Sequence, residues 1–240
     1  MSEAEGTAAL PHDQLRLVPG APEVALGPED LAQLPAGSVP PPWDFRMDGV
    51  LWIQRAVRDA GAVLPSPLRR RRGFAPGFGG LVAYRESPVG PYREMLASPT
   101  LIRGGLWRSH VPFIAVDDAA GLYAGRAHWA FPKSFATFSG DFASPGMLEA
   151  RGTAWWLRSR VRTIGPRVPF WLRISFAQVW PDGSIGSFPV TFRGWVRLGQ
   201  VEVAVAEEAS FAAWLRPGRH LAFVLTDTRV HLPAARRAHH

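Results

Sequence analysis

The clearest pattern along the chain is a series of short segments rich in β-branched and aromatic residues, separated by clusters of Gly, Pro and Asp. Such segments are typical of strands, and the clusters between them are typical of turns. The strands that we expect span residues 49–54, 79–84, 110–116, 154–161, 169–179, 187–192, 194–205 and 220–226. Many strands at short spacing predict a mainly β protein with minor α content, folded as an antiparallel barrel or sandwich.

Helical patterns are rare. Residues 207–215 place their large apolar side chains on one side and are followed by a glycine, so they predict the one convincing helix. Residues 55–64 could form a short helix, and residues 125–134 one helical turn that ends at a proline. Residues 87–94 look like a strand but contain two prolines and a glycine, which favours an edge strand or a bulge.

The two ends of the chain differ from the middle. Residues 1–40 are rich in Ala, Gly, Pro and acidic residues without a clear period, so we expect a disordered or loosely docked N-terminal arm. Residues 41–232 are expected to form a single β domain, and residues 233–240 a tail. No apolar run is long enough to cross a bilayer, which favours a cytoplasmic protein with no membrane partner.

The charge balance narrows the classes of partner. A net charge of +7 is compatible with nucleic-acid binding, but the arginines are scattered along the chain. The one dense run, residues 69–72, lies between Pro-rich and Gly-rich segments and is typical of a solvated loop. We therefore expect no nucleic-acid partner, and the charge could instead steer an anionic substrate. The absence of cysteine excludes disulfide and thiolate chemistry.

Motifs of the common nucleotide-binding and hydrolytic sites are absent. The chain has no Gly-x-Gly-x-x-Gly after a strand, no phosphate-binding loop and no Gly-x-Ser-x-Gly elbow. Its seven histidines show no metal-ligand spacing. His128 could line a pocket, although a packed or exposed imidazole is the commoner case. We expect no metal and no cofactor.

One cation stands apart from all the others. The chain has 27 Lys and Arg residues in total, and Lys133 is the only lysine among them. Lysine, unlike arginine, can lose its proton and act as an amine nucleophile. Lys133 follows a proline and lies close in sequence to Trp129, Phe131 and Phe135, which could remove its ammonium group from water. A structural or surface lysine is the alternative.

An unprotonated lysine could form an imine with a ketone or aldehyde. The iminium cation withdraws electrons from the adjacent carbon, which promotes loss of CO2 from a β-keto acid or loss of an α-proton. Lowering the pKa of a lysine from about 10.4 to about 7 requires about 4–5 kcal/mol from its environment. Burial in an aromatic cavity can supply an effect of this size.

Three short motifs together resemble the acetoacetate decarboxylase family. They are Ser87-Pro-Val-Gly-Pro-Tyr-Arg-Glu94, Gly125-Arg126 and Pro132-Lys133, with 39 residues separating Glu94 from Lys133. The resemblance covers about residues 43–230. It implies that Lys133 forms a Schiff base and that Glu94 points into the same cavity. It also implies a cone-like antiparallel β-barrel or double barrel with an enclosed apolar pocket, in a homo-oligomer.

The chain departs from the family at three positions. Ser134 stands where the family has a second lysine, and Gly79 stands where it has a second pocket glutamate. The family's first-strand arginine has no clear counterpart, and Arg46 is the nearest candidate. These departures favour aldol or dehydratase chemistry slightly over decarboxylation.

The resulting hypothesis is an imine-forming lyase that acts on a small oxo acid without a cofactor. Lys133 would carry the imine, and Glu94 would donate or accept protons. Arg126 could hold a substrate carboxylate or anchor the backbone, and the sequence leaves both roles open. Tyr92, Trp129 and Phe131 are expected to line the pocket, with plain core packing as the alternative. The competing hypothesis is a non-catalytic β-barrel that binds a ligand in the same pocket.

Overall fold

The computed structural model describes residues 9–55, 57, 63–69, 76–102 and 108–238. Its main feature is one thirteen-stranded sheet. The strands are β1 (Trp43–Gln54), β2 (Gly77–Glu86), β3 (Tyr92–Ser98), β4 (Leu101–Ile102), β5 (Arg108–Ser109), β6 (Phe113–Val116), β7 (Lys133–Phe135), β8 (Thr137–Ser139), β9 (Met147–Arg151), β10 (Trp156–Val179), β11 (Ile185–Val205), β12 (Gly218–Leu232) and β13 (Arg236–Ala238). The helices are α1 (Pro28–Ala32), α2 (Ser66–Arg69) and α3 (Ala119–Trp129), with 3-10 turns at His12–Leu17, Pro22–Val24 and Ser210–Ala213.

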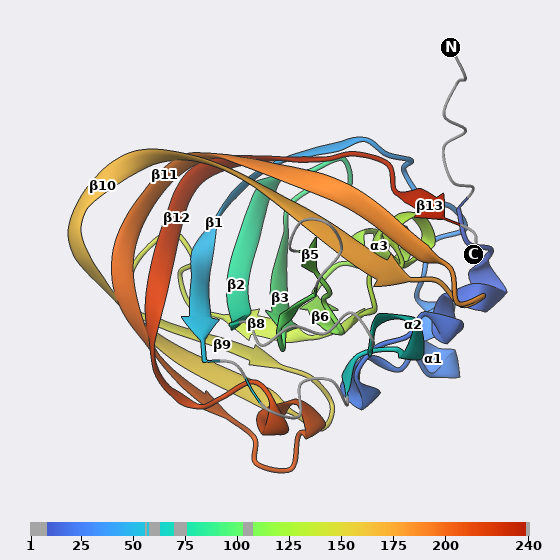
Figure 1. Ribbon diagram of the computed structural model, residues 1–240, viewed down its shortest axis with the longest axis horizontal. Helices are drawn as coiled ribbons and strands as arrows, with labels where there is room; N and C mark the ends of the chain where they lie inside the picture. The colour runs from blue at the N-terminus through green and yellow to red at the C-terminus, as the bar shows by residue number, and fades with distance from the viewer. Residues whose placement is uncertain (1–8, 56, 58–62, 70–75, 103–107, 239–240) are drawn as a thin grey trace.

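The strands pair in the order β4-β5-β10-β11-β12-β1-β2-β3-β6-β7, and β9 extends the sheet from the other half of β10. All pairs are antiparallel except β5–β10 and β6–β7. Figure 1 shows β10, β11, β12, β1, β2 and β3 side by side, with β10 and β11 bending round one end of the molecule. The predicted mainly β class is confirmed, in the form of a strongly curled sheet.

The two longest strands each join two segments that the sequence separates. β10 contains both 154–161 and 169–179 almost entirely, and β11 contains both 187–192 and 194–205. The ladder between β10 and β11 shifts register between Ile164 and Val168, where Gly165 has a φ of 73°. Gly and Pro at this point were expected to end a strand. In fact they form a bulge that bends one continuous strand.

The helix predictions were wrong in two places. Residues 207–215 contain only the short 3-10 turn Ser210–Ala213, because Phe211 and Trp214 are held by ring contacts with the core rather than by a helical face. The longest helix is α3, where we expected only one turn at its end. Its residues from Gly121 to Trp129 are all buried, so the sequence has no polar face and no amphipathic period there.

The segment 87–94 differs from its prediction, and two other predicted segments lie largely outside the described residues. The segment 87–94 is neither an edge strand nor a bulge: residues 87–91 form the turn of the β2–β3 hairpin, closed by a hydrogen bond from the Gly90 amide to the Ser87 carbonyl at 3.1 Å, and residues 92–94 begin β3. The prolines occupy this turn, where no ladder hydrogen bond is needed. The expected helix at 55–64 and most of the arginine run at 69–72 lie outside the described residues.

The N-terminal segment is docked rather than loose over its described part. Leu15 and Val24 are at most 1% exposed, and the Leu10 amide donates to the Ala127 carbonyl of α3 at 2.9 Å. The apolar residues of this segment occur at 3-10 turns and between them, so they show neither a helical nor a strand period. The expectation of a loosely docked arm is therefore corrected for residues 9–34, which cover one side of α3.

The central strands β1–β3 separate two hydrophobic cores. Side chains alternate between the two faces of a strand, so Leu81 and Met95 point to one core while Val82 and Glu94 point to the other. The first half of β10 contributes Leu157 and Val161 to the first core, and its second half contributes Phe176 to the second core. One bent strand thus covers both faces of the sheet.

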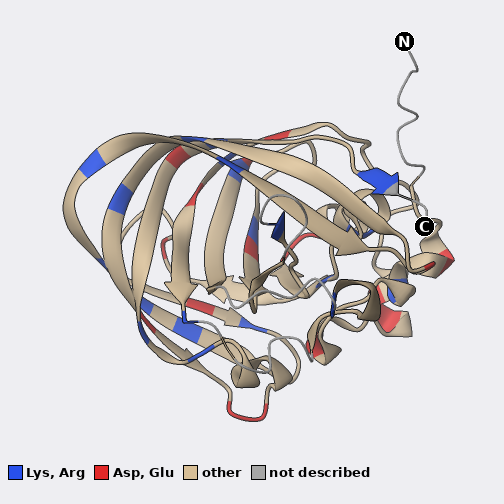
Figure 2. Ribbon diagram, in the orientation of Figure 1, with Lys and Arg blue, Asp and Glu red and all other residues tan. Residues whose placement is uncertain are grey.

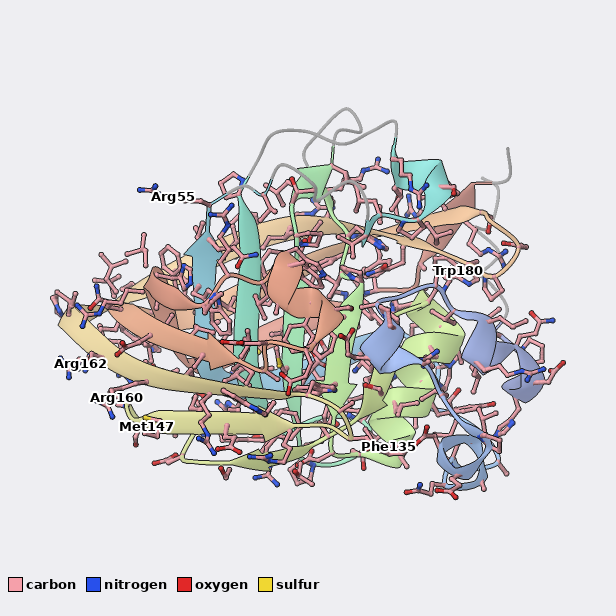
Figure 3. All side chains as sticks on the ribbon, turned by 90° about the horizontal axis from the view of Figure 1, so that it is seen from below. Arg55, Phe135, Met147, Arg160, Arg162 and Trp180 are labelled. Atoms are coloured by element: carbon pink, nitrogen blue, oxygen red, sulfur yellow. The ribbon has the colours of Figure 1, made fainter. Side chains whose placement is uncertain are left out.

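Charged side chains lie mostly on the outside of this assembly. Figure 2 shows basic and acidic positions interspersed along the strands and near the termini rather than gathered on one surface. Arg160 and Arg162 on β10 and Met147 on β9 point away from the sheet (Figure 3), and all three are exposed. No helix among the described residues is long and apolar enough to cross a membrane.

Candidate active site

A cavity of about 340 Å³ lies on the second face of the sheet. Its walls come from one side of β1–β3, from the second half of β10 and the first half of β11, from β12 and from the end of α3. Aromatic side chains make up much of the lining, namely Trp43, Phe45, Trp52, Phe78, Tyr84, Tyr92, Trp129, Phe131, Phe176, Phe192 and Phe223. Cavities of this size and apolar character are typical of small-molecule sites.

Lys133 and Glu94 form a buried ion pair in this cavity. The Lys133 Nζ lies 2.7 Å from the Glu94 Oε2, and the two side chains are 6% and 7% exposed. They are the only charged residues among the described residues that line the cavity. The structure therefore brings together the two residues on which the sequence hypothesis depends, and it excludes the alternative of a surface lysine.

The end of α3 places Lys133 at this position. The helix begins at Asp118, whose carboxylate accepts a hydrogen bond from the Gly121 amide at 2.5 Å. It ends at Ala130, which has a left-handed φ of 49° and is followed two residues later by Pro132. The chain then enters β7, where Lys133 pairs with Ile114 of β6.

Glu94 reaches the same point from the other side of β6. It lies on β3 and pairs with Val116, two residues along β6 from Ile114. Residues two apart on a strand face the same side of the sheet, so β6 serves as a spacer that points both side chains into the cavity. The parallel β6–β7 pairing, which follows from the α3 crossover, fixes this arrangement.

Gly125 makes room for the lysine side chain. A Cβ atom at this position would lie 2.6 Å from both Cδ and Cε of Lys133. Only a glycine lets the stem of the lysine lie directly against α3 without displacement. Steric contact with Lys133 therefore explains why the first residue of the Gly125-Arg126 motif is a glycine.

Two tyrosines surround the ion pair. The Tyr84 hydroxyl donates to the Glu94 Oε1 at 3.2 Å, and the Tyr92 hydroxyl lies 3.5 Å from the Lys133 Nζ, which also sits 5.2 Å from the centre of the Tyr92 ring. Burial, reinforced by the Glu94 charge, raises the pKa of both tyrosines well above the ordinary value. Both side chains therefore remain neutral phenols that can donate hydrogen bonds.

Tyr84 was not among the residues singled out from the sequence. Its signal was present in the strand pattern, because Tyr84 pairs directly with Tyr92 across the β2–β3 hairpin. Directly opposite residues of an antiparallel pair face the same side, so a correctly placed turn at 87–90 would have put both hydroxyls in one site.

Arg126 has the anchoring role and not the substrate-binding role. Its Nε donates to the Lys133 carbonyl at 2.6 Å, Nη1 donates to the Leu15 carbonyl at 2.7 Å, and Nη2 donates to the Val24 carbonyl. The side chain is fully buried and does not line the cavity. Burial lowers its pKa to about 9, so the guanidinium stays charged at neutral pH. Of the two roles that the sequence leaves open, these contacts favour the backbone anchor: Arg126 joins the N-terminal segment to β7.

The remaining predicted site residues divide into two groups. Tyr92, Trp129 and Phe131 line the cavity as expected, and the Trp129 indole also donates to the Pro233 carbonyl at 2.7 Å. His128 does not line the cavity. Its Nε2 lies 2.8 Å from the Ser38 hydroxyl, and burial lowers its pKa.

The three positions that depart from the family pattern all lie off the cavity. Gly79 faces the first core, where a Cβ atom would lie 2.3 Å from the Trp52 ring. Ser134 follows Lys133 on β7 and so points to the opposite face, with its hydroxyl 3.5 Å from the Ile114 carbonyl. Arg46 is paired with Glu86 and Asp227 at 3.3 and 2.7 Å. None of the three shapes this cavity.

The site offers acid–base and amine chemistry but no metal ligands. Within the described parts of the chain, no group of three or more His, Cys, Asp or Glu residues is placed to hold a metal ion. The reactive groups present are one amine, one carboxylate and two phenols. They can transfer a proton between nitrogen and oxygen inside an apolar enclosure.

The comparison with solved structures gives a consistent result. The enduracididine biosynthesis enzyme MppR matches with a TM-score of 0.60 and 18% identity, over 83% of this chain and 88% of that one. Acetoacetate decarboxylase from Legionella pneumophila matches with a TM-score of 0.57 and 14% identity, over 86% and 93%. An acetoacetate decarboxylase-like enzyme from Sphingomonas wittichii matches with a TM-score of 0.53 and 15% identity, over 89% and 98%.

Comparisons of the sequence alone, by contrast, find no match. No protein-family model matches the chain, and no curated protein is similar enough in sequence to match it. The similarity to solved structures lies at 14–18% identity and therefore speaks for the fold. The resemblance inferred from the three short motifs is thus confirmed at the level of architecture: the chain has the fold of acetoacetate decarboxylase and its structural relatives.

Proposed function

We propose that the protein is an imine-forming lyase in which Lys133 condenses with the carbonyl group of an oxo acid or a related ketone. The observation that carries the proposal is the 2.7 Å contact between the Lys133 Nζ and the Glu94 Oε2 inside an apolar cavity. A buried amine beside a carboxylate has its proton acceptor within hydrogen-bond reach, which is the geometry that nucleophilic catalysis by lysine requires.

Imine formation at this site needs only the groups already in contact. Glu94 accepts a proton from the Lys133 ammonium group, and the free amine attacks the carbonyl carbon to give a carbinolamine. Glu94 returns a proton to the carbinolamine hydroxyl, which leaves as water while the nitrogen lone pair forms the C=N bond. An ammonium group and a neutral carbonyl compound thus give an iminium ion and water, with no change in net charge.

The iminium ion then serves as the electron sink. Loss of CO2 from a 3-oxo acid or loss of an α-proton sends the electron pair toward the iminium nitrogen and gives an enamine. Glu94 is the carboxylate in reach to move the proton, and Tyr92 is the phenol in reach of the nitrogen. Protonation of the enamine carbon regenerates an iminium ion. Addition of water to this iminium ion then releases the ketone product and restores the ammonium–carboxylate pair.

Two known complexes of a structural relative agree with carbonyl chemistry. MppR has been solved with pyruvate and with the condensation product of pyruvate and imidazole 4-carboxaldehyde. Those ligands belong to that protein. They motivate aldol-type condensation as the first reaction to try with this chain, ahead of decarboxylation.

Reductive trapping tests the proposal. Incubation with pyruvate or 2-octanone and cyanoborohydride should add the mass of one reduced adduct to the intact protein, and peptide mapping should place it on Lys133. The variant Lys133→Arg should gain no adduct, and Glu94→Gln should slow adduct formation by about a hundredfold or more. Equal adduct formation in wild type and Lys133→Arg would reject the assignment.

The competing function is non-catalytic ligand binding in the same cavity. The dense aromatic lining favours it as the second candidate, because such a cavity holds apolar ligands without any covalent step. Calorimetric binding of 2-octanone with no trapped adduct and no turnover would support this function and reject imine formation.

A further inference from the structure

The charges around the cavity argue against a substrate recognised mainly by its carboxylate. Among the described residues of the lining, Lys133 and Glu94 are the only ionised groups, and they neutralise one another. Arg126 donates its hydrogen bonds to three backbone carbonyls and does not line the cavity. A buried carboxylate without its own cation is costly. The binding free energy must therefore come mainly from apolar contact.

The cavity extends well beyond the ion pair. Val82 lies opposite Glu94 on the neighbouring strand, and Phe78 lies four residues further along β2. Both residues line the cavity. At the usual rise of about 3.3 Å per residue, the lining continues for about 13 Å past the level of Glu94. A three-carbon oxo acid bound to Lys133 would leave this length unfilled.

The two ends of the cavity differ in exposure. At one end Trp43 and Trp129 are each 1% exposed and close it. At the other end Ile53, which pairs with Phe78, also lines the cavity but is 43% exposed, and the lining residue Pro76 is exposed as well. Large apolar side chains that are exposed at the rim of a cavity are typical of a surface on which an apolar ligand rests.

From these observations we propose that the substrate carries an apolar tail, an alkyl chain of about six carbons or an aryl group, on the carbonyl that reacts with Lys133. The tail points along β1 and β2, past Leu51, toward Phe78 and the more exposed end at Ile53. This inference rests on the proposed imine function and defines its substrate class. The apolar walls select the tail, and the Lys133–Glu94 pair reacts with the carbonyl.

Two matched pairs of ligands separate chain length from the carboxylate. Pyruvate and 2-oxooctanoate are both 2-oxo acids and differ only in their alkyl chain, and acetone and 2-octanone repeat the comparison without the carboxylate. The measured quantity is the concentration that gives half-maximal cyanoborohydride trapping on Lys133. Within each pair, the eight-carbon member should require a concentration at least tenfold lower, since each buried methylene favours binding.

A pair of variants at the open end provides the matched control. Ile53 on β1 lies directly opposite Leu221 on β12, and Leu221 is 54% exposed but does not line the cavity. The substitution Ile53→Asp should reduce the advantage of the eight-carbon ligands over their three-carbon counterparts. The substitution Leu221→Asp should leave all four ligands unchanged.

The outcomes distinguish this inference from the function on which it rests. If no ligand of either length is trapped on Lys133, the imine function is wrong. If pyruvate and acetone are trapped at the same concentrations as their eight-carbon counterparts, imine chemistry stands and the apolar-tail inference is overturned. It is also overturned if Ile53→Asp and Leu221→Asp have equal effects on the eight-carbon ligands.

Discussion

The central strands β1–β3 have a filled hydrophobic core on one side and a cavity on the other. Leu81 and Met95 point to a core in which both are fully buried. Their neighbours Val82 and Glu94 point to a cavity of about 340 Å³. We call these sides the packed face and the hollow face. Strand alternation alone produces both, so what differs is the element that covers each side.

The covering elements explain the difference. The packed face is closed by aromatic side chains in edge contact, with Phe113 and Phe211 both contacting Trp155 at centroid distances of 5.1 and 5.7 Å. The hollow face is covered by the second half of β10 and the first half of β11, which the bend at 164–168 carries over the sheet. On the packed face the rings fill the space beneath the strands, whereas on the hollow face a space of about 340 Å³ remains. The Lys133–Glu94 pair is thus removed from solvent while space remains beside it for a ligand.

The largest expected loss of stability comes from removing the hydrogen bonds by which Arg126 joins the N-terminal segment to β7. Arg126→Met removes three hydrogen bonds from a buried cation and leaves three backbone carbonyls without this donor. Each loss costs about 1.5–3 kcal/mol, so the free energy of unfolding should fall by about 5 kcal/mol in urea titrations. Arg158→Met, at an exposed pair with Glu149, should change it by at most about 1 kcal/mol. Equal losses would show that Arg126 is no anchor.

A matched leucine pair compares the two faces directly. Leu81 is fully buried on the packed face, and Leu96 lines the cavity on the neighbouring strand. Leu81→Ala should cost about 3–4 kcal/mol because it opens a new void. Leu96→Ala should cost about 1–2 kcal/mol because the void already exists and only the transfer contribution is lost. Thermal and urea unfolding measure both, and equal costs would contradict a hollow face.

His110, a buried imidazole outside the cavity, should make the stability of the protein depend on pH. His110 is fully buried, and burial lowers its pKa from 6.5 to about 4. As pH falls from about 6.5, the unfolded chain binds a proton that the folded protein does not. Stability should therefore decrease by about 3 kcal/mol down to about pH 4. His110→Gln should flatten this part of the stability profile, whereas exposed His231→Gln should not.

The smallest effect on stability and a large one on reactivity should come from Gly125→Ala. The new methyl group would meet the flexible end of Lys133, which can shift at a cost of about 1 kcal/mol. The displaced amine should react with pyruvate at least tenfold more slowly in the trapping assay. Gly37→Ala, where a Cβ atom would meet no other atom within 4 Å, is the control and should react normally. Similar rates in both variants would mean that the packing of Lys133 on α3 is irrelevant.

The sequence predicted the strands and the Glu94–Lys133 pair because both leave local signals. Strands show as β-branched and aromatic segments between turn residues, and the pair lies in motifs whose types and spacing resemble those of the acetoacetate decarboxylase family. It failed at α3 because a helix that is buried all round has no amphipathic period. It failed at the bend in β10 because Gly165 and its neighbouring proline look like a strand end and only the tertiary ladder shows that the strand continues.

The site itself was predicted in part for similar reasons. The placement of Tyr92, Trp129 and Phe131 at the cavity is as expected. The role of Arg126 required knowledge of the N-terminal segment, whose carbonyls at Leu15 and Val24 lie more than a hundred residues away in sequence. Such contacts leave no local pattern. The expected homo-oligomer stays a prediction.

The most direct test of the account uses the fact that the chain has a single lysine. Protein labelled with lysine carrying ¹³C at Cε gives one side-chain signal, and the N-terminal amine stays unlabelled. On addition of 2-oxooctanoate this signal should move to the position of a methylene carbon bonded to an iminium nitrogen, and borohydride should move it again to that of a methylene carbon bonded to a secondary amine. If the ligand binds while the signal keeps the position of a free lysine, Lys133 is not the imine-forming residue.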